Sequence, residues 1–73
     1  MSKRRDLDCL HDIQEAMHRI LTYTADLTYQ QFMEDIKTQD AVVRNLEIIG
    51  EATKNLSVNA RKSHSEVPWK ELM

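Results

Sequence analysis

Apolar residues recur at steps of three and four along residues 4–24, a spacing that predicts an amphipathic helix. The predicted apolar face consists of Leu7, Leu10, Ile13, Met17, Ile20, Leu21 and Thr24. The opposite face carries Asp8, Glu15 and Arg19. Ser2 has the side chain of an N-cap and precedes this pattern. We therefore predict a long first helix.

The tetrapeptide from Thr28 to Gln31 has the pattern of a capping box, in which two side chains satisfy each other's backbone amides. A short helix is expected after it, over residues 29–36, with Phe32, Met33 and Ile36 buried. This box predicts a turn that is specified locally.

A third helix is expected after Asp40, with Thr38 as the alternative N-cap. Its predicted core stripe is Val42, Leu46, Ile49, Gly50, Thr53, Leu56 and Ala60. A second, narrower strip is formed by Ala41, Ile48 and Ala52. A surface helix needs only one stripe, so this helix is predicted to be covered from two sides. Glycine inside a helix costs up to ~1 kcal/mol relative to alanine, and Gly50 is therefore expected at a close helix crossing.

The chain becomes polar over residues 57–66, and the third helix is expected to end near Lys62. Pro68 then suits the first position of another helix, in which Trp69, Leu72 and Met73 share an apolar face. About one and a half turns are not stable alone in water, so this segment is expected to need cover from elsewhere.

Composition agrees with an all-α fold in one domain, residues 1–73. The chain has one glycine and one proline among 73 residues. The predicted architecture is an incomplete helical bundle, with two long antiparallel helices, a short connecting helix and the start of a fourth. No apolar segment is long enough to span a bilayer, and no leader peptide is expected.

Charge and cysteine content narrow the function classes. Ten basic and twelve acidic residues give a net charge of −2, which provides no general attraction to nucleic acid. This balance does not exclude a local basic patch. The single Cys9 cannot form an internal disulfide, and a lone thiol favours a reducing, cytoplasmic environment.

One helix face offers three potential metal ligands, His11, Glu15 and His18. They lie away from the apolar stripe and no second ligand group faces them, so a solvated flank is the favoured interpretation. We predict no metal and no cofactor.

The polar face of the third helix has two interpretations. Its members are Arg44, Glu47, Glu51, Lys54 and Asn55. A solvated charged face is favoured, and the alternative is the lining of a cleft shared with another helix.

Two blocks of sequence resemble the HepT-like family of HEPN-domain proteins. The first is AVVRNLEIIGEATKNLS, residues 41–57, and the second is VPW, residues 67–69. The resemblance implies a helical bundle that dimerises and acts as a ribonuclease toxin, paired with a nucleotidyltransferase antitoxin of the MntA type. The family signature is an Arg, four to six residues, a His, any residue and a Tyr. In it the His acts as general acid and base on the RNA 2′-hydroxyl, the Arg stabilises the phosphate, and the antitoxin attaches AMP to the Tyr.

The resemblance places this signature after Trp69, and we expect a chain truncated before the catalytic motif. Arg5 and His11 have a fitting spacing, but Ile13 stands where the Tyr belongs, so the match is treated as chance. No catalytic residue is carried over. Arg44 and Glu51 match the family block and are expected to support or line the cleft.

Three functions are compatible with these residues and with the resemblance. The first is an incomplete toxin without nuclease activity of its own. The second is a helical module that dimerises, or binds the antitoxin or a full-length toxin, through Ile48, Ala52 and Trp69. The third is an active ribonuclease whose remaining residues follow Met73, with RNA as substrate.

Overall fold

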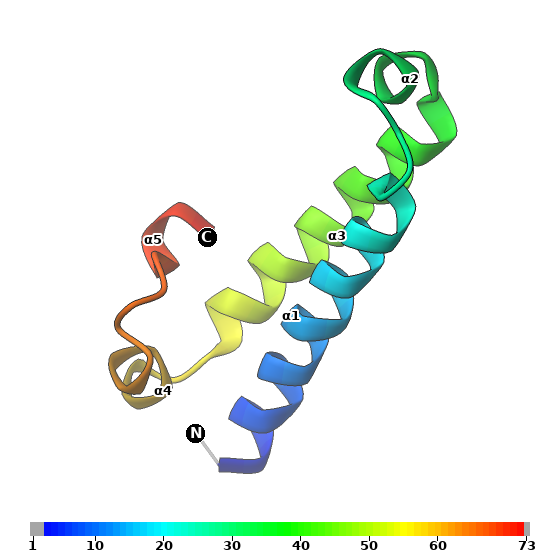
Figure 1. Ribbon diagram of the computed structural model, residues 1–73. Coiled ribbons are helices and arrows are strands. Elements are labelled where there is room, and N and C mark those ends of the chain that lie inside the picture. Colours follow the sequence, from blue (N-terminus) through cyan, green and yellow to red (C-terminus); the bar gives the residue numbers. More distant parts are fainter. Residues whose placement is uncertain (1–2, 73) are drawn as a thin grey trace.

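Two long helices, α1 (Lys3–Thr24) and α3 (Ile36–Asn55), lie side by side and run antiparallel (Figure 1). The computed structural model describes residues 3–72, and within this range all regular elements are helices. A short helix, α2 (Tyr29–Glu34), closes the turn between the long ones. The predicted all-α architecture is confirmed. The predicted cap Ser2 lies outside the described residues, as does Met73.

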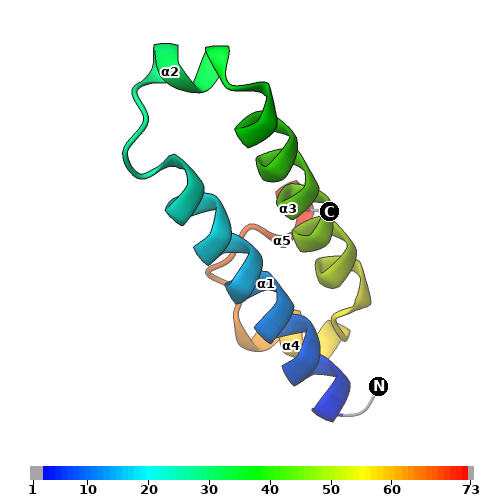
Figure 2. The same ribbon diagram turned by 90° about the vertical axis from the view of Figure 1, so that its right-hand side faces the viewer.

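The other two helices are short and lie together on one side of the hairpin (Figures 1 and 2). They are α4 (Val58–Ser63) and α5 (Trp69–Leu72). None of the helices in the described range is long and apolar enough to cross a membrane.

The turn from α1 is specified by the predicted capping box. The Thr28 hydroxyl accepts from the Gln31 amide at 3.1 Å, and the Gln31 side chain accepts from the Thr28 amide at 2.9 Å. The predicted helix over residues 29–36 instead ends at Glu34, and Ile36 begins α3. Its predicted burial was also wrong, since Met33 and Ile36 are 54% and 70% exposed and Phe32 is only half-buried. The only helix that α2 contacts extensively among the described residues is α3, which leaves these side chains largely uncovered.

The N-cap of α3 is Asp35, not the predicted Asp40 or Thr38. One Asp35 oxygen accepts from the Thr38 amide at 3.0 Å and the other from the Thr38 hydroxyl at 2.6 Å. Both bonds hold the pKa of Asp35 below its usual value, and the bond from the hydroxyl has the larger effect. Gln39 donates to the carbonyls of Phe32 and Met33, so the last turn of α2 and the first turn of α3 share their hydrogen bonds.

The core lies between α1 and α3 and is built largely from small side chains. Its buried members are Cys9, Ile13, Ala16, Ile49, Ala52, Leu56 and Thr53. The Thr53 hydroxyl is fully buried and donates to the Ile49 carbonyl at 2.7 Å. Because the distance between two packed helices depends on the side chains at their contact, the small residues allow close approach.

On both long helices the buried face is therefore rotated about the helix axis relative to the predicted apolar stripe. Four predicted core residues stay exposed: Leu7, Met17, Leu21 and Leu46. Ala52, assigned to a separate strip, is instead in the core. The observed contact follows the small side chains, and the larger ones lie along one flank of it.

The third helix ends earlier than predicted. Leu56 has an extended backbone, with φ −69° and ψ 141°, and Ser57 begins α4 as its N-cap. The Ser57 hydroxyl accepts from the Ala60 amide at 3.1 Å. The prediction of one helix reaching Lys62 was wrong, because this serine offers the following amides a new cap.

Gly50 lies at the predicted helix crossing. A Cβ atom at this position would be 3.4 Å from the Leu72 carbonyl oxygen of α5. Trp69 and Leu72 of α5 pack against the core, and the Trp69 indole donates to the carbonyls of Arg61 and His64. These two bonds join α5 to the end of α4. Helix α3 is therefore covered by α1 on one face and by α5 on another.

Substitution of Gly50 tests this crossing. Gly50→Leu is expected to push α5 away, because its side chain meets the backbone of Leu72 rather than a flexible side chain. Since Trp69 is the only tryptophan, its fluorescence should shift to longer wavelength as the ring becomes hydrated. Gly50→Ala is the matched control: its Cβ fits at contact distance, and α3 should gain up to ~1 kcal/mol in urea unfolding. An unchanged Trp69 spectrum in Gly50→Leu contradicts the crossing.

Candidate functional site

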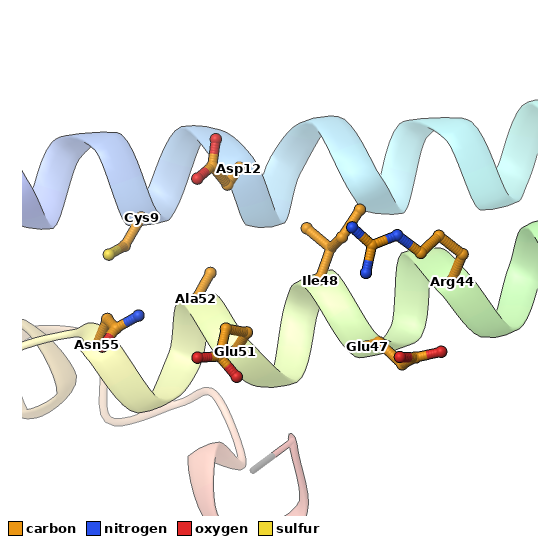
Figure 3. Close-up of a pocket in the computed structure, with 8 residues that line it drawn as sticks. All are labelled: Cys9, Asp12, Arg44, Glu47, Ile48, Glu51, Ala52 and Asn55. Carbon is orange, nitrogen blue, oxygen red and sulfur yellow. The ribbon is translucent and has the colours of Figure 1, made fainter.

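A cleft of about 370 Å³ lies between α1 and α3 (Figure 3). Its lining residues are Cys9, Asp12, Arg44, Glu47, Ile48, Glu51, Ala52 and Asn55. Those from α3 fall at helical steps of three and four, which places them on one face of the helix. Arg44 and Glu51 both line this cleft, and both side chains are exposed, as the favoured interpretation of a solvated face also expects; their role stays a prediction.

The charged groups of this cleft do not neutralise one another. The side chains of Arg44, Glu47 and Glu51 are exposed, and none of them forms a hydrogen bond or ion pair with another residue in the range 3–72. The Arg44 side chain extends from α3 toward α1 (Figure 3). The cleft thus presents a guanidinium and carboxylates whose hydrogen-bonding groups are available to a ligand or to another segment.

Cys9 forms part of the apolar floor. It is 8% exposed, and burial raises the pKa of its thiol. A thiol that stays protonated is a poor nucleophile. Cys9 therefore acts as a small packing residue.

Asn45 is a buried polar residue that the hydrophobic pattern of the sequence did not single out. It is 5% exposed, and its side-chain amide donates to the Ala41 carbonyl at 2.8 Å. Its Oδ1 atom is buried and has no hydrogen-bond partner among the described residues. The sequence offered one indication of this burial: Asn45 lies one helical turn before Ile49, on the face of α3 that contacts α1. An unmatched buried acceptor costs about 1–3 kcal/mol, so this atom marks a point where a donor is favoured.

One end of the cleft is closed by contacts between the start of α1 and the end of α3. Arg5 Nη2 donates to Asn55 Oδ1 at 3.5 Å. The Asp6 carboxylate accepts from the Ser57 amide at 2.9 Å and from the Ser57 hydroxyl at 2.7 Å. Both bonds hold the pKa of Asp6 below its usual value, and the bond from the amide has the larger effect. Neither contact was predicted, because each joins residues about fifty positions apart.

The three potential metal ligands on α1 do not gather into a site. Glu15 forms an ion pair with Arg19 and lies 3.9 Å from His11. Over residues 3–72, no three His, Cys, Asp or Glu side chains are placed to hold a metal ion together.

The predicted association residues occupy different environments. Ile48 and Trp69 are half-buried and Ala52 is buried against α1. Ile48 and Ala52 line the cleft, whereas Trp69 lies with α4 and α5. Their role in association stays a prediction.

Comparison with known proteins gives consistent matches. The family described as Ribonuclease HepT-like matches residues 13–73. A probable ribonuclease HepT of Thermococcus cleftensis is 46% identical over 70 residues, covering 96% of this chain and 64% of the relative. A putative RNase of Methanocaldococcus jannaschii is 49% identical over 61 residues, covering 84% of this chain and 50% of the relative. The chain thus spans between half and two thirds of these relatives. No solved structure gives a significant match.

The Asp6–Ser57 contact predicts a pH-dependent stability. Because the folded state holds the pKa of Asp6 below its unfolded value, the stabilisation is fully present above about pH 4 and is lost as pH falls through the folded value. Asp6→Asn should therefore lower the urea midpoint at pH 7, and the difference from the unsubstituted chain should shrink toward pH 3. Asp8→Asn, with the same charge change at an exposed position, should leave the pH 7 midpoint nearly unchanged. A deficit in Asp6→Asn that is equal at both pH values contradicts the role of the ionised carboxylate.

Proposed function

Since this chain belongs to the ribonuclease HepT-like family, we propose that its 73 residues form the helical scaffold of a toxin of a toxin–antitoxin system. The observation that carries the proposal is the 46% identity to a probable ribonuclease HepT over nearly the whole of this chain. Cleavage of cellular RNA in the cytoplasm is the activity proposed for the complete protein.

The chemistry proposed for the complete protein needs residues of the Arg, His and Tyr signature. No Arg, spacer, His, residue, Tyr series of that kind occurs in residues 1–73. We propose that these residues alone do not cleave RNA, and that α1 and α3 instead support the segment that carries the signature. Arg44 and Glu51 then line the cleft beside that segment.

A nucleotidyltransferase antitoxin of the MntA type is the proposed protein partner. Such an enzyme transfers AMP to the signature tyrosine, so it needs access to the side of the hairpin that carries this segment. The open, charged cleft between α1 and α3 supports this arrangement, because charged groups without partners favour a polar protein surface.

A cleavage assay tests the proposed lack of activity. The purified 73-residue chain is incubated with RNA labelled at both ends, and the expected result is no product above the buffer control. His11→Ala and Arg44→Ala, prepared in the same way, serve to separate contamination from activity. Cleavage by the unsubstituted chain that either substitution abolishes overturns the proposal, whereas cleavage equal in all three preparations identifies a contaminant.

A second candidate function is that of a self-associating module, and the exposed apolar residues favour it. Leu21 and Leu46 are 67% and 54% exposed, and Leu7 and Met17 continue the flank on α1. Large apolar patches seldom stay exposed on a monomer. We propose that a second copy covers this flank, which lies on the side of the hairpin away from the predicted association residues Ile48 and Ala52.

Sedimentation at micromolar concentration tests this candidate. The unsubstituted chain should sediment as a dimer or larger species. Leu21→Glu and Leu46→Glu should each shift it toward the monomer, because a buried, unpaired carboxylate opposes association. Val58→Glu, at a similarly exposed position on α4, is the matched control and should leave the oligomer intact. A well-folded monomer of the unsubstituted chain rules this candidate out.

A further inference from the structure

The basic residues of this chain are gathered at one end of the molecule. Six of its ten Lys and Arg residues lie in residues 3–5 and 54–62, and these two segments contain no Asp or Glu. The six residues are Lys3, Arg4, Arg5, Lys54, Arg61 and Lys62. We call these two segments together the basic end.

The fold, and not the sequence order, brings the two segments together. The Asp6 carboxylate holds Ser57, the N-cap of α4, and Arg5 reaches Asn55. Figure 1 shows the start of α1 and helix α4 at the same end of the hairpin. The opposite end, at α2, is acidic: residues 26–40 hold four acidic residues and one lysine. Along a molecule 42 Å long, a net charge of −2 thus conceals two ends of opposite sign.

Helix stability does not account for the basic start of α1. The first turn of a helix carries a partial positive charge, so Lys and Arg residues there are unfavourable. Asp6 is the acidic residue of this turn, and its carboxylate, which accepts from the amide and hydroxyl of Ser57, keeps one negative charge beside Arg5. Residues 3–5 place three positive charges in this turn against the one negative charge of Asp6, so the sequence gives the start of α1 a net positive charge.

Helix α4 continues this positive surface toward α5. Arg61 and Lys62 line a groove of about 450 Å³ together with Lys70 and Trp69; Glu71 is the acidic member of the lining. The Trp69 ring is fixed there by the two hydrogen bonds of its indole nitrogen. Basic side chains beside a fixed aromatic ring are typical of surfaces that bind single-stranded nucleic acid.

We propose that the basic end and the adjoining α4–α5 groove bind the phosphate backbone of RNA, apart from the α1–α3 cleft. This inference rests on the proposed function, which supplies RNA as the polyanion. Binding is independent of sequence and depends on salt, because it arises from Lys and Arg contacts to phosphates. The surface holds the RNA strand on the scaffold while cleavage occurs elsewhere in the complete protein.

Fluorescence anisotropy with a labelled, single-stranded 2′-O-methyl RNA tests the proposal. This probe lacks the 2′-hydroxyl needed for cleavage, so binding is measured whether or not the chain has nuclease activity. The double variant Arg61→Gln with Lys62→Gln should weaken binding about tenfold at about 100 mM salt and lower the slope of log affinity against log salt by about 1.4. The matched control is Arg19→Gln with Lys37→Gln, which removes the same charge away from the basic end. It should bind like the unsubstituted chain.

Three results overturn the proposal. They are equal weakening in both double variants, binding that salt leaves unchanged, and binding to phosphatidylserine vesicles without binding to RNA. Circular dichroism of each variant checks that the helices are retained. Cleavage of ordinary RNA by the 73-residue chain contradicts the proposed scaffold role but leaves this anisotropy result standing, so the two failures are distinguishable.

Discussion

The close contact of α1 with α3 is the interaction on which the rest of the structure depends. It is made by small side chains, Cys9 and Ala16 from α1 and Ala52 from α3, with Ile13 and Ile49 between them. Because these side chains are short, the two backbones approach closely and the larger apolar residues are left on one flank. The polar residues of both helices fall on the other flank, where they border the cleft.

This contact gives the two sides of the hairpin different chemistry. One side presents Arg44, Glu47 and Glu51 around a cleft. On the other side α5 rests on α3 at Gly50, and Leu21 and Leu46 remain exposed. Both sides thus present side chains that the contacts among the described residues leave exposed.

The ends of the hairpin are as different as its sides. At one end the Asp35–Thr38 and Thr28–Gln31 caps join α2 to its neighbours through local hydrogen bonds. At the other, Asp6 binds Ser57 across about fifty positions of sequence and sets α4 beside the start of α1. This contact brings two basic segments of the sequence to the same end, and charge therefore separates along the molecule.

The sequence by itself determined the helical class, the capping box at Thr28 and the close crossing at Gly50, because these depend on local periodicity and backbone chemistry. It also determined the family, through residues 41–57 and 67–69. Only the tertiary structure decided which flank of each helix is buried, since small side chains at Ala16 and Ala52 give no strong signal in an apolar pattern yet control how closely helices pack. For the same reason the early end of α3, the Asp6–Ser57 bond and the orphaned oxygen of Asn45 were not predicted. Each depends on which distant residues meet, and that is a property of the packed chain.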